Sequence, residues 1–170
     1  MKRLIYFGLL AGGINIIGWL VLDLIFQGDE FDFSMGETLG YTAMLIALSA
    51  VFFGIKSYRD KELQGTITFK NAFMKGLIIV LIASLIYVVG WEIYYPSFEA
   101  DIGEKYANHL MQELQSQGLS ASEIAAERAN MDVWMEKYQN PLYRIPITFT
   151  EIFPVGLIVT LISALILKRK

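Results

Sequence analysis

The sequence predicts an all-α protein: a four-helix transmembrane bundle with an extracytoplasmic amphipathic helical hairpin between the third and fourth transmembrane helices. Two observations of composition indicate a membrane protein. Hydrophobic residues make up 55% of the 170 residues and charged residues only 18%, whereas soluble chains are about 25% charged. The mean hydropathy is +0.46. The arrangement of the apolar residues is a further observation: they are gathered into four long blocks, the pattern expected when lipid is the solvent.

The first apolar block, residues 4–26, is predicted to be a retained transmembrane helix. Its uncharged part, residues 4–22, holds 19 residues, which span a hydrocarbon core at about 1.5 Å per residue. Lys2 and Arg3 precede it as in a signal peptide. However, the stretch exceeds the roughly 7 to 15 apolar residues of such a segment, and no small-residue cleavage site follows it.

Three further apolar blocks predict transmembrane helices over residues 38–55, 76–95 and 147–167. Two of these blocks are short for a bilayer, and flanking aromatic and long charged side chains are expected to extend them. Pro154 lies inside the last block and removes one backbone hydrogen bond. It therefore predicts either a bend in that helix or its true beginning.

The distribution of basic residues predicts the orientation in the membrane. Two lie before the first helix, five lie between residues 56 and 75, and three end the chain, whereas the other segments hold four. Because basic flanks stay in the cytoplasm, both termini are predicted to be cytoplasmic. The cytoplasmic segments then carry ten basic and two acidic residues, a net charge of +8. The remainder of the chain carries four basic and fifteen acidic residues, a net charge of −11.

The polar stretch before the last block is predicted to form a helical hairpin over residues 98–138. The apolar positions of its first helix recur every four residues, at Ile102, Tyr106, Leu110 and Leu114. Gly118 can end that helix in a left-handed conformation, and Ser120 with Glu123 has the spacing of a capping box. The apolar positions of the second helix are Ile124, Met131, Trp134, Met135 and Tyr138, and Pro141 follows its end.

An internal echo relates residues 67–86 to residues 147–166, which agree at 11 of 20 positions. Transporters use inverted helices of this kind to build a central site. Shared apolar composition is the alternative explanation for this similarity.

Gly8 and Gly12 are spaced for close helix contact, either within the bundle or between copies in a homo-oligomer.

Several classes of chemistry are excluded by the residue inventory. The chain has no cysteine and one histidine, His109, so thiolate sites and spaced zinc ligands are absent from the sequence. It contains no Gly-rich phosphate loop, and no basic stripe suited to nucleic acid. We therefore expect no catalytic residue, no metal or cofactor site, and no enzymatic activity.

Polar residues inside membrane helices are the candidates for function, because a charge in the bilayer centre costs about 3 kcal/mol. Asp23, Glu92 and Glu151 lie near the outer ends of their helices and can form one layer. They can then share protons, hold a cation or pair with Arg144; alternatively, they sit in water at headgroup depth. Asn15 is predicted to make a hydrogen bond between helices.

Four stretches carry a family resemblance: FFGIKSYRDK at residues 52–61, the run at 76–95, NPLYR at 140–144, and the C-terminal run at 148–170. With these stretches the chain resembles a bacterial membrane family, catalogued as domain of unknown function 4199 and frequent in Bacteroidota. The resemblance implies a membrane location and a bacterial source. It brings no activity.

Three functional hypotheses follow. The first is a non-enzymatic envelope protein in contact with the lipid bilayer, whose acidic extracytoplasmic hairpin binds a protein partner or lipids. The second is a small oligomeric transporter or ion-coupled protein that uses Asp23, Glu92 and Glu151. The third, a membrane enzyme, is disfavoured because these acids lack a base, nucleophile or metal ligand at a recognisable spacing.

Overall fold

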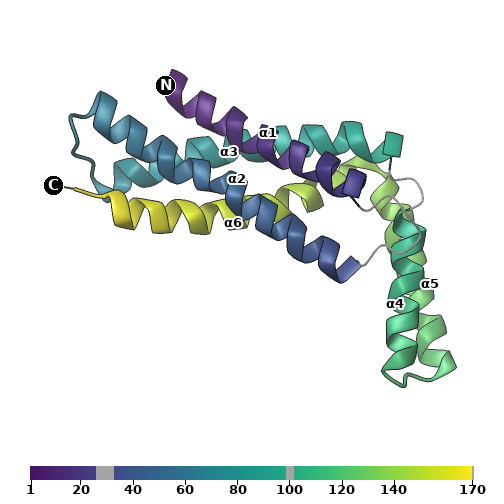
Figure 1. Cartoon of the computed structure of the whole chain (residues 1–170). Coiled ribbons are helices and arrows are strands. Elements are labelled where there is room, and N and C mark those ends of the chain that lie inside the picture. The colour runs from purple at the N-terminus through teal and green to yellow at the C-terminus, as the bar shows by residue number, and fades with distance from the viewer. Residues whose placement is uncertain (26–32, 99–101, 170) are drawn as a thin grey trace. The chain divides into compact units, whose positions relative to one another are not determined.

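The computed structural model describes residues 1–25, 33–98 and 102–169, apart from a few side chains near helix ends, that of Asp23 among them. Six helices follow one another along this part of the chain (Figure 1). They are α1 (Lys2–Ile25), α2 (Phe33–Glu62), α3 (Phe69–Phe98), α4 (Ile102–Ser116), α5 (Ala121–Gln139) and α6 (Pro141–Leu167).

Four of the helices are long and apolar enough to cross a membrane, which confirms the predicted all-α fold with four membrane helices. The spans are Lys2–Leu22, Met35–Glu62, Phe69–Pro96 and Pro141–Leu167. The helices are longer than the apolar blocks, because a helix can continue into water after the apolar residues end. In particular, α6 begins at Pro141 rather than at residue 147, since proline is well suited to the first turn of a helix. It continues through Pro154.

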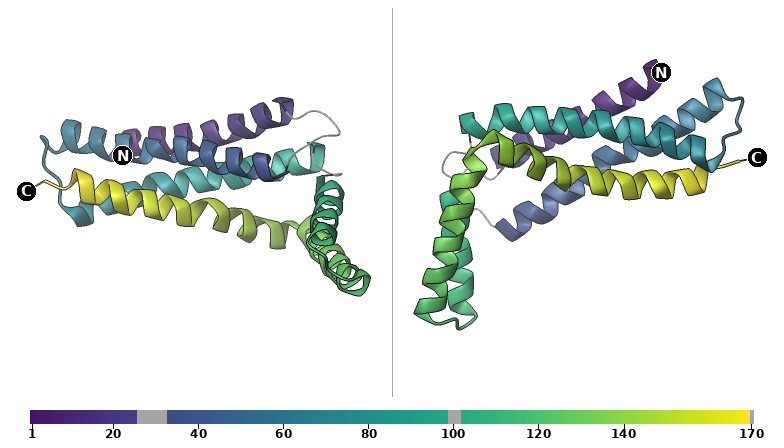
Figure 2. Two further views of the ribbon diagram at one scale, coloured as in Figure 1. Left: turned by 60° about the horizontal axis from the view of Figure 1, so that its bottom comes forward. Right: turned by 180° about the vertical axis from the view of Figure 1, so that it is seen from behind.

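The chain forms two compact units, which we describe separately (Figure 2). Unit 1 consists of Met1–Gly90 and Thr148–Lys170, and therefore holds α1, α2 and most of α3 and α6. Unit 2 is Trp91–Ile147. It holds α4 and α5 with the end of α3 and the beginning of α6.

In unit 1, α1 and α3 run parallel and meet at glycines. A Cβ atom at Gly12 would lie 2.5 Å from the Cβ atom of Ile86, and one at Gly8 would lie 2.7 Å from that of Ile82. One turn further along, the glycine is on the other helix, where Gly90 meets Ile16. Membrane helices associate through such close packing. The predicted close approach at Gly8 and Gly12 is thus made within one chain.

Helices α3 and α6 pack as an antiparallel pair, and their contacts follow the sequence similarity between residues 67–86 and 147–166. Gly76 of α3 lies against Thr160 of α6, and Gly156 of α6 lies against Val80 of α3. The echo matches residues 80 apart, so it equates Gly76 with Gly156 and Val80 with Thr160. Exchanging the two helices therefore exchanges these two contacts. Each helix supplies one glycine and one β-branched residue, and each glycine receives the other helix's branched side chain.

One end of unit 1 gathers the basic segments. Three interactions join them: an Arg3–Glu62 salt bridge at 3.1 Å, a hydrogen bond from Arg59 to the Leu167 carbonyl oxygen at 3.2 Å, and backbone pairing of Ile67 with Arg169. The beginning of α1, the connection between α2 and α3, and the end of α6 consequently lie together. An even number of membrane crossings requires this arrangement.

The distribution of side chains in unit 1 suits a lipid environment. Small and polar residues are buried between the helices, among them Ser84, Thr160 and Ser163, whereas large aliphatic residues such as Ile46 and Ile166 are more than 60% exposed. A soluble bundle buries its large apolar residues in preference to hydroxyl groups. In a membrane, small residues belong at helix interfaces and large apolar residues can face lipid.

Unit 2 contains the predicted helical hairpin. Gly118 ends α4 with a φ of 85°, and Ser120 with Glu123 forms the predicted capping box at the beginning of α5. The Ser120 hydroxyl donates to the Glu123 carboxylate at 2.6 Å. This bond, with a second from the Ser120 backbone, lowers the pKa of the Glu123 carboxyl below its ordinary value. The local sequence alone was enough to predict this turn.

Among the described side chains of α4, the inward face differs from the prediction at Tyr106. Ala107 is fully buried, and a Cβ atom at Gly103 would lie 3.2 Å from the Sδ atom of Met135. Tyr106, predicted to belong to the apolar stripe, is instead 44% exposed. Gly103 and Ala107 are small, so α5 approaches α4 on their side and Tyr106 is turned outward.

Two adjacent glycines provide a test of the α1–α3 contact. We expect Gly12→Ala to lower the free energy of unfolding by about 1 to 3 kcal/mol, because the new methyl group overlaps Ile86. Gly13→Ala is the matched control, since a Cβ atom there meets nothing within 4 Å. Thermal unfolding of both variants in detergent measures the difference. Equal stability of the two variants would contradict this packing.

Candidate functional site

Arg144 is the centre of a polar cluster in unit 2. Its side chain is 4% exposed and makes a two-pronged salt bridge with Glu92, with Nη2–Oε2 at 2.7 Å and Nε–Oε1 at 2.8 Å. Nη1 also donates to the backbone oxygens of Tyr138 at 3.1 Å and Gln139 at 3.2 Å. These carbonyls end α5 and would otherwise lack helical partners.

Aromatic rings enclose the same guanidinium. It lies over the ring of Tyr95, 4.5 Å from the centroid, and 5.9 Å from that of Tyr138, where the ring faces attract the cation. Trp91 donates from Nε1 to the Tyr138 hydroxyl at 2.9 Å, and Trp134 stacks on Tyr138 at 4.8 Å. We call these six side chains the Arg144 cluster: Glu92, Arg144, Trp91, Tyr95, Trp134 and Tyr138.

The Arg144 cluster is built to hold helices together. Its residues come from the end of α3, the end of α5 and the beginning of α6, which are the chain segments on both sides of the hairpin. An arginine keeps its charge at any physiological pH and fits a carboxylate with two parallel bonds. Within the described residues no group of three or more metal-ligating side chains occurs. The two-pronged bond to Glu92 and the bonds to the α5 carbonyls connect these segments through Arg144.

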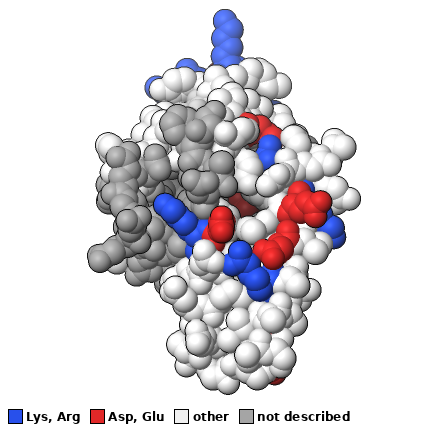
Figure 3. All heavy atoms as spheres, turned by 90° about the vertical axis from the view of Figure 1, so that its right-hand side faces the viewer, with Lys and Arg blue, Asp and Glu red and all other residues white. Residues whose placement is uncertain are grey.

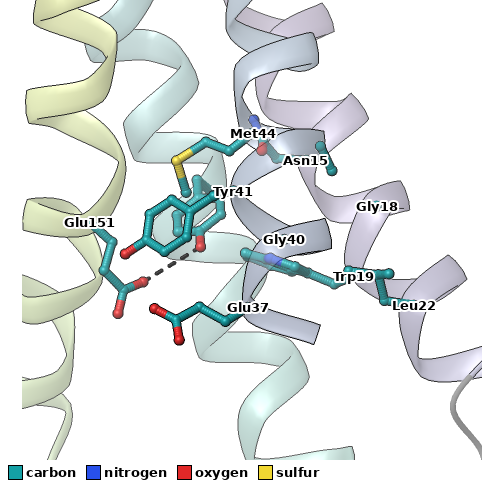
Figure 4. Close-up of a pocket in the computed structure, with 11 residues that line it drawn as sticks. Asn15, Gly18, Trp19, Leu22, Glu37, Gly40, Tyr41, Met44 and Glu151 are labelled. Atoms are coloured by element: carbon teal, nitrogen blue, oxygen red, sulfur yellow. Dashed lines mark hydrogen bonds between the residues drawn. The ribbon is translucent and has the colours of Figure 1, made fainter. Parts of the chain in front are cut away.

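Unit 1 contains a cavity of about 230 Å³ between its four helices (Figure 4). The Tyr87 hydroxyl donates to Oε2 of Glu151 at 3.5 Å, and Trp19 meets Tyr87 edge to face at 4.4 Å. The lining residues are Asn15, Gly18, Trp19, Leu22, Glu37, Gly40, Tyr41, Ala43, Met44, Tyr87 and Glu151.

The predicted polar layer is divided between these two places. Glu151 and Asn15 line the cavity in unit 1, whereas Glu92 pairs with Arg144 in unit 2, one of the outcomes the sequence left open. The side chain of Asp23 lies outside the described residues. Asn15 donates to the Ala11 carbonyl of its own helix at 2.9 Å. The prediction of a bond between helices was wrong, because this carbonyl lies one turn earlier on the same face.

A family match covers both places. The family model described as "Protein of unknown function (DUF4199)" matches residues 6–169. The chain belongs to this family. The DUF4199 match includes every residue of the Arg144 cluster and of the cavity lining. Neither the curated proteins nor the solved structures give a match to the chain.

Sequence reasoning missed part of both sites in this DUF4199 protein. Glu37 was left out of the polar layer because the predicted helix began one residue later, whereas α2 begins at Phe33. Glu37 would have been included if the predicted helix had been extended toward its N-terminus beyond the apolar residues. Tyr87 could not be predicted as a site residue, since a single tyrosine within an apolar helix does not differ from a packing residue in the hydropathy pattern.

The Arg144 cluster gives a stability prediction. We expect Glu92→Gln to destabilise unit 2 by about 3 kcal/mol, because a buried guanidinium loses its counter-charge; the value is at the low end since Glu92 is 20% exposed. Hydrogen exchange of α5 amides in detergent measures the change.

The control is Asp132→Asn, which breaks a salt bridge to Arg128 whose side chains are 55% and 33% exposed. Exposed pairs contribute only about 0 to 1 kcal/mol, so exchange should barely change. Equal protection in Glu92→Gln and Asp132→Asn would show that the Arg144 cluster does not hold α5.

Proposed function

We propose that this DUF4199 protein is a non-enzymatic, multi-pass protein of the bacterial inner membrane that presents its α4–α5 hairpin, outside the cytoplasm, to a protein partner. The observation that carries the proposal is the Arg144 cluster. Burying a guanidinium costs free energy even when it is paired. In return, the cluster joins the end of α5 to the chain segments on both sides of the hairpin.

The surface of the hairpin favours a protein with basic and apolar groups as the partner. Tyr106, Val133 and Trp134 are 44 to 51% exposed on α4 and α5. The hairpin, residues 102–139, carries six acidic and three basic residues, a net charge of −3, which anionic headgroups repel. Figure 3 views one face of the molecule, where acidic and basic side chains lie close together beside wide uncharged surface.

Charge asymmetry supports the proposed orientation. The basic N-terminal, 56–75 and C-terminal segments meet at one end of unit 1, and basic segments are retained in the cytoplasm. The transporter alternative has less support, because Glu92, one of its three acids, is held by Arg144. Assembly into homo-oligomers stays a prediction.

The orientation can be tested with single cysteines, since the natural chain has none. We expect Ser116→Cys, at the end of α4, to react with a membrane-impermeant maleimide added to intact spheroplasts. Lys61→Cys, in the basic segment, should react only after the membrane is opened. Labelling in the reverse order would overturn the topology, and labelling of both in intact spheroplasts would show that the reagent or the membrane is unsuitable as a barrier.

The partner can be tested by photo-crosslinking in the native host. A photoreactive phenylalanine at position 134 should give one discrete protein adduct, whereas the same residue at position 117 should not. Reversing charge with Glu127→Lys and Glu136→Lys should weaken the adduct about tenfold, because the partner surface is expected to be basic. Adducts at both positions, or an adduct unaffected by charge reversal, would argue against a specific partner on this face.

A further inference from the structure

The cavity of unit 1 has the chemistry of a binding site that the hairpin function does not use. Glu37 enters from α2 and Glu151 from α6, and Figure 4 draws both carboxyl groups directed into the same space. None of the eleven described lining residues is Lys, Arg or His. Both glutamates are exposed at the cavity, and since no basic side chain among these neighbours offers them a counter-charge, a cation from outside the chain can supply it.

A second observation concerns Asn15. Its side chain is only 3% exposed and lines the cavity, and its Nδ2 atom is used by the Ala11 carbonyl. Within the described part of the chain, no hydrogen bond reaches the Asn15 Oδ1 atom. The oxygen is not sealed from solvent, since the buried side-chain atoms without a partner in the described residues belong to Ser84, Thr148 and Thr160. It is therefore open to the cavity that Asn15 lines, where a ligand with N–H groups would donate to it.

Aromatic residues complete the lining. Trp19, Tyr41 and Tyr87 come from three different helices, and their ring faces attract cations. The lining thus combines carboxylate oxygens, one amide oxygen and ring faces, all of which are electron-rich. The volume of about 230 Å³ is below the roughly 300 to 1,000 Å³ of sites for drug-sized ligands. A volume of this size suits a small ligand.

From this combination we infer that the cavity binds a small primary ammonium ion, with Glu37 and Glu151 as counter-charges, Asn15 as a hydrogen-bond acceptor and the aromatic rings around the alkyl part. Such an ammonium group can come from a free amine or from the ethanolamine headgroup of a phospholipid. Glu37 and Tyr41 are exposed at the cavity rim, which leaves a route for either source.

Calorimetric titration of the full chain in a non-ionic detergent tests the chemistry. We expect ethanolamine hydrochloride to bind, ethylene glycol not to bind because it lacks the charge, and choline to bind more weakly because it lacks N–H donors. Glu151→Gln and Glu37→Gln should each weaken ethanolamine binding about tenfold or more. Glu136→Gln on the hairpin is the matched control and should bind as the natural chain does.

A pair of variants at one position tests the aromatic contribution without removing charge. Tyr41→Phe should retain ethanolamine binding, since the ring face is kept, and Tyr41→Leu should weaken it severalfold. Circular dichroism and thermal unfolding of each variant establish that it is folded before its titration is interpreted.

Nanodiscs that contain equal amounts of phosphatidylethanolamine and phosphatidylglycerol distinguish the two sources. If the headgroup is the ligand, the natural chain should retain phosphatidylethanolamine through detergent extraction, Glu151→Gln should not, and free ethanolamine should displace it. If a free amine is the ligand, ethanolamine binds in detergent without retention of either lipid. Failure of the natural chain both to bind ethanolamine and to retain phosphatidylethanolamine would overturn the inference, as would unchanged binding in both Gln variants.

Discussion

The close approach of α3 to the other membrane helices is the constraint on which unit 1 depends. On each neighbouring helix, a glycine leaves room for a side chain of α3. Gly8 and Gly12 of α1 do so, Gly54 of α2 contacts Ile79, and Gly156 of α6 contacts Val80. Lipid is as apolar as leucine, so burying large side chains does not drive these helices together, and packing must do so. Glycine provides the packing because it has no Cβ atom to hold the helices apart. The large apolar residues are thereby left to face lipid.

Charged residues are treated differently in the two units. In unit 2, Arg144 meets a carboxylate, two carbonyl oxygens and aromatic faces, so its charge is compensated inside the protein. In unit 1, Glu37 and Glu151 share a cavity without a basic lining residue among those described. The compensated cluster is suited to holding the end of α5 against the end of α3 and the beginning of α6. The cavity, whose charge is not balanced by its lining, is suited to a ligand.

Features written in short stretches of sequence were predictable to different degrees. The capping box of Ser120 and Glu123 was predicted because both partners lie within one turn. The four membrane helices followed from hydropathy, although their ends did not, because a helix extends into water past its apolar residues. The inward face of α4 was assigned to Tyr106 instead of Ala107, since periodicity favours the larger apolar residue while close packing selects the smaller one.

By itself, the sequence determined that this DUF4199 protein is an all-α membrane protein with four spans, because hydropathy and length are properties of single segments. It also named Glu92, Arg144, Glu151 and Asn15 as residues of interest, since polar groups in apolar helices are conspicuous. Only the tertiary structure decided that Glu92 pairs with Arg144 and that Glu151 shares a cavity with Asn15 and the overlooked Glu37. Those pairings depend on which helices become neighbours. Small residues decide which helices can pack together, but they hardly change the hydropathy pattern, so the sequence does not reveal the neighbours.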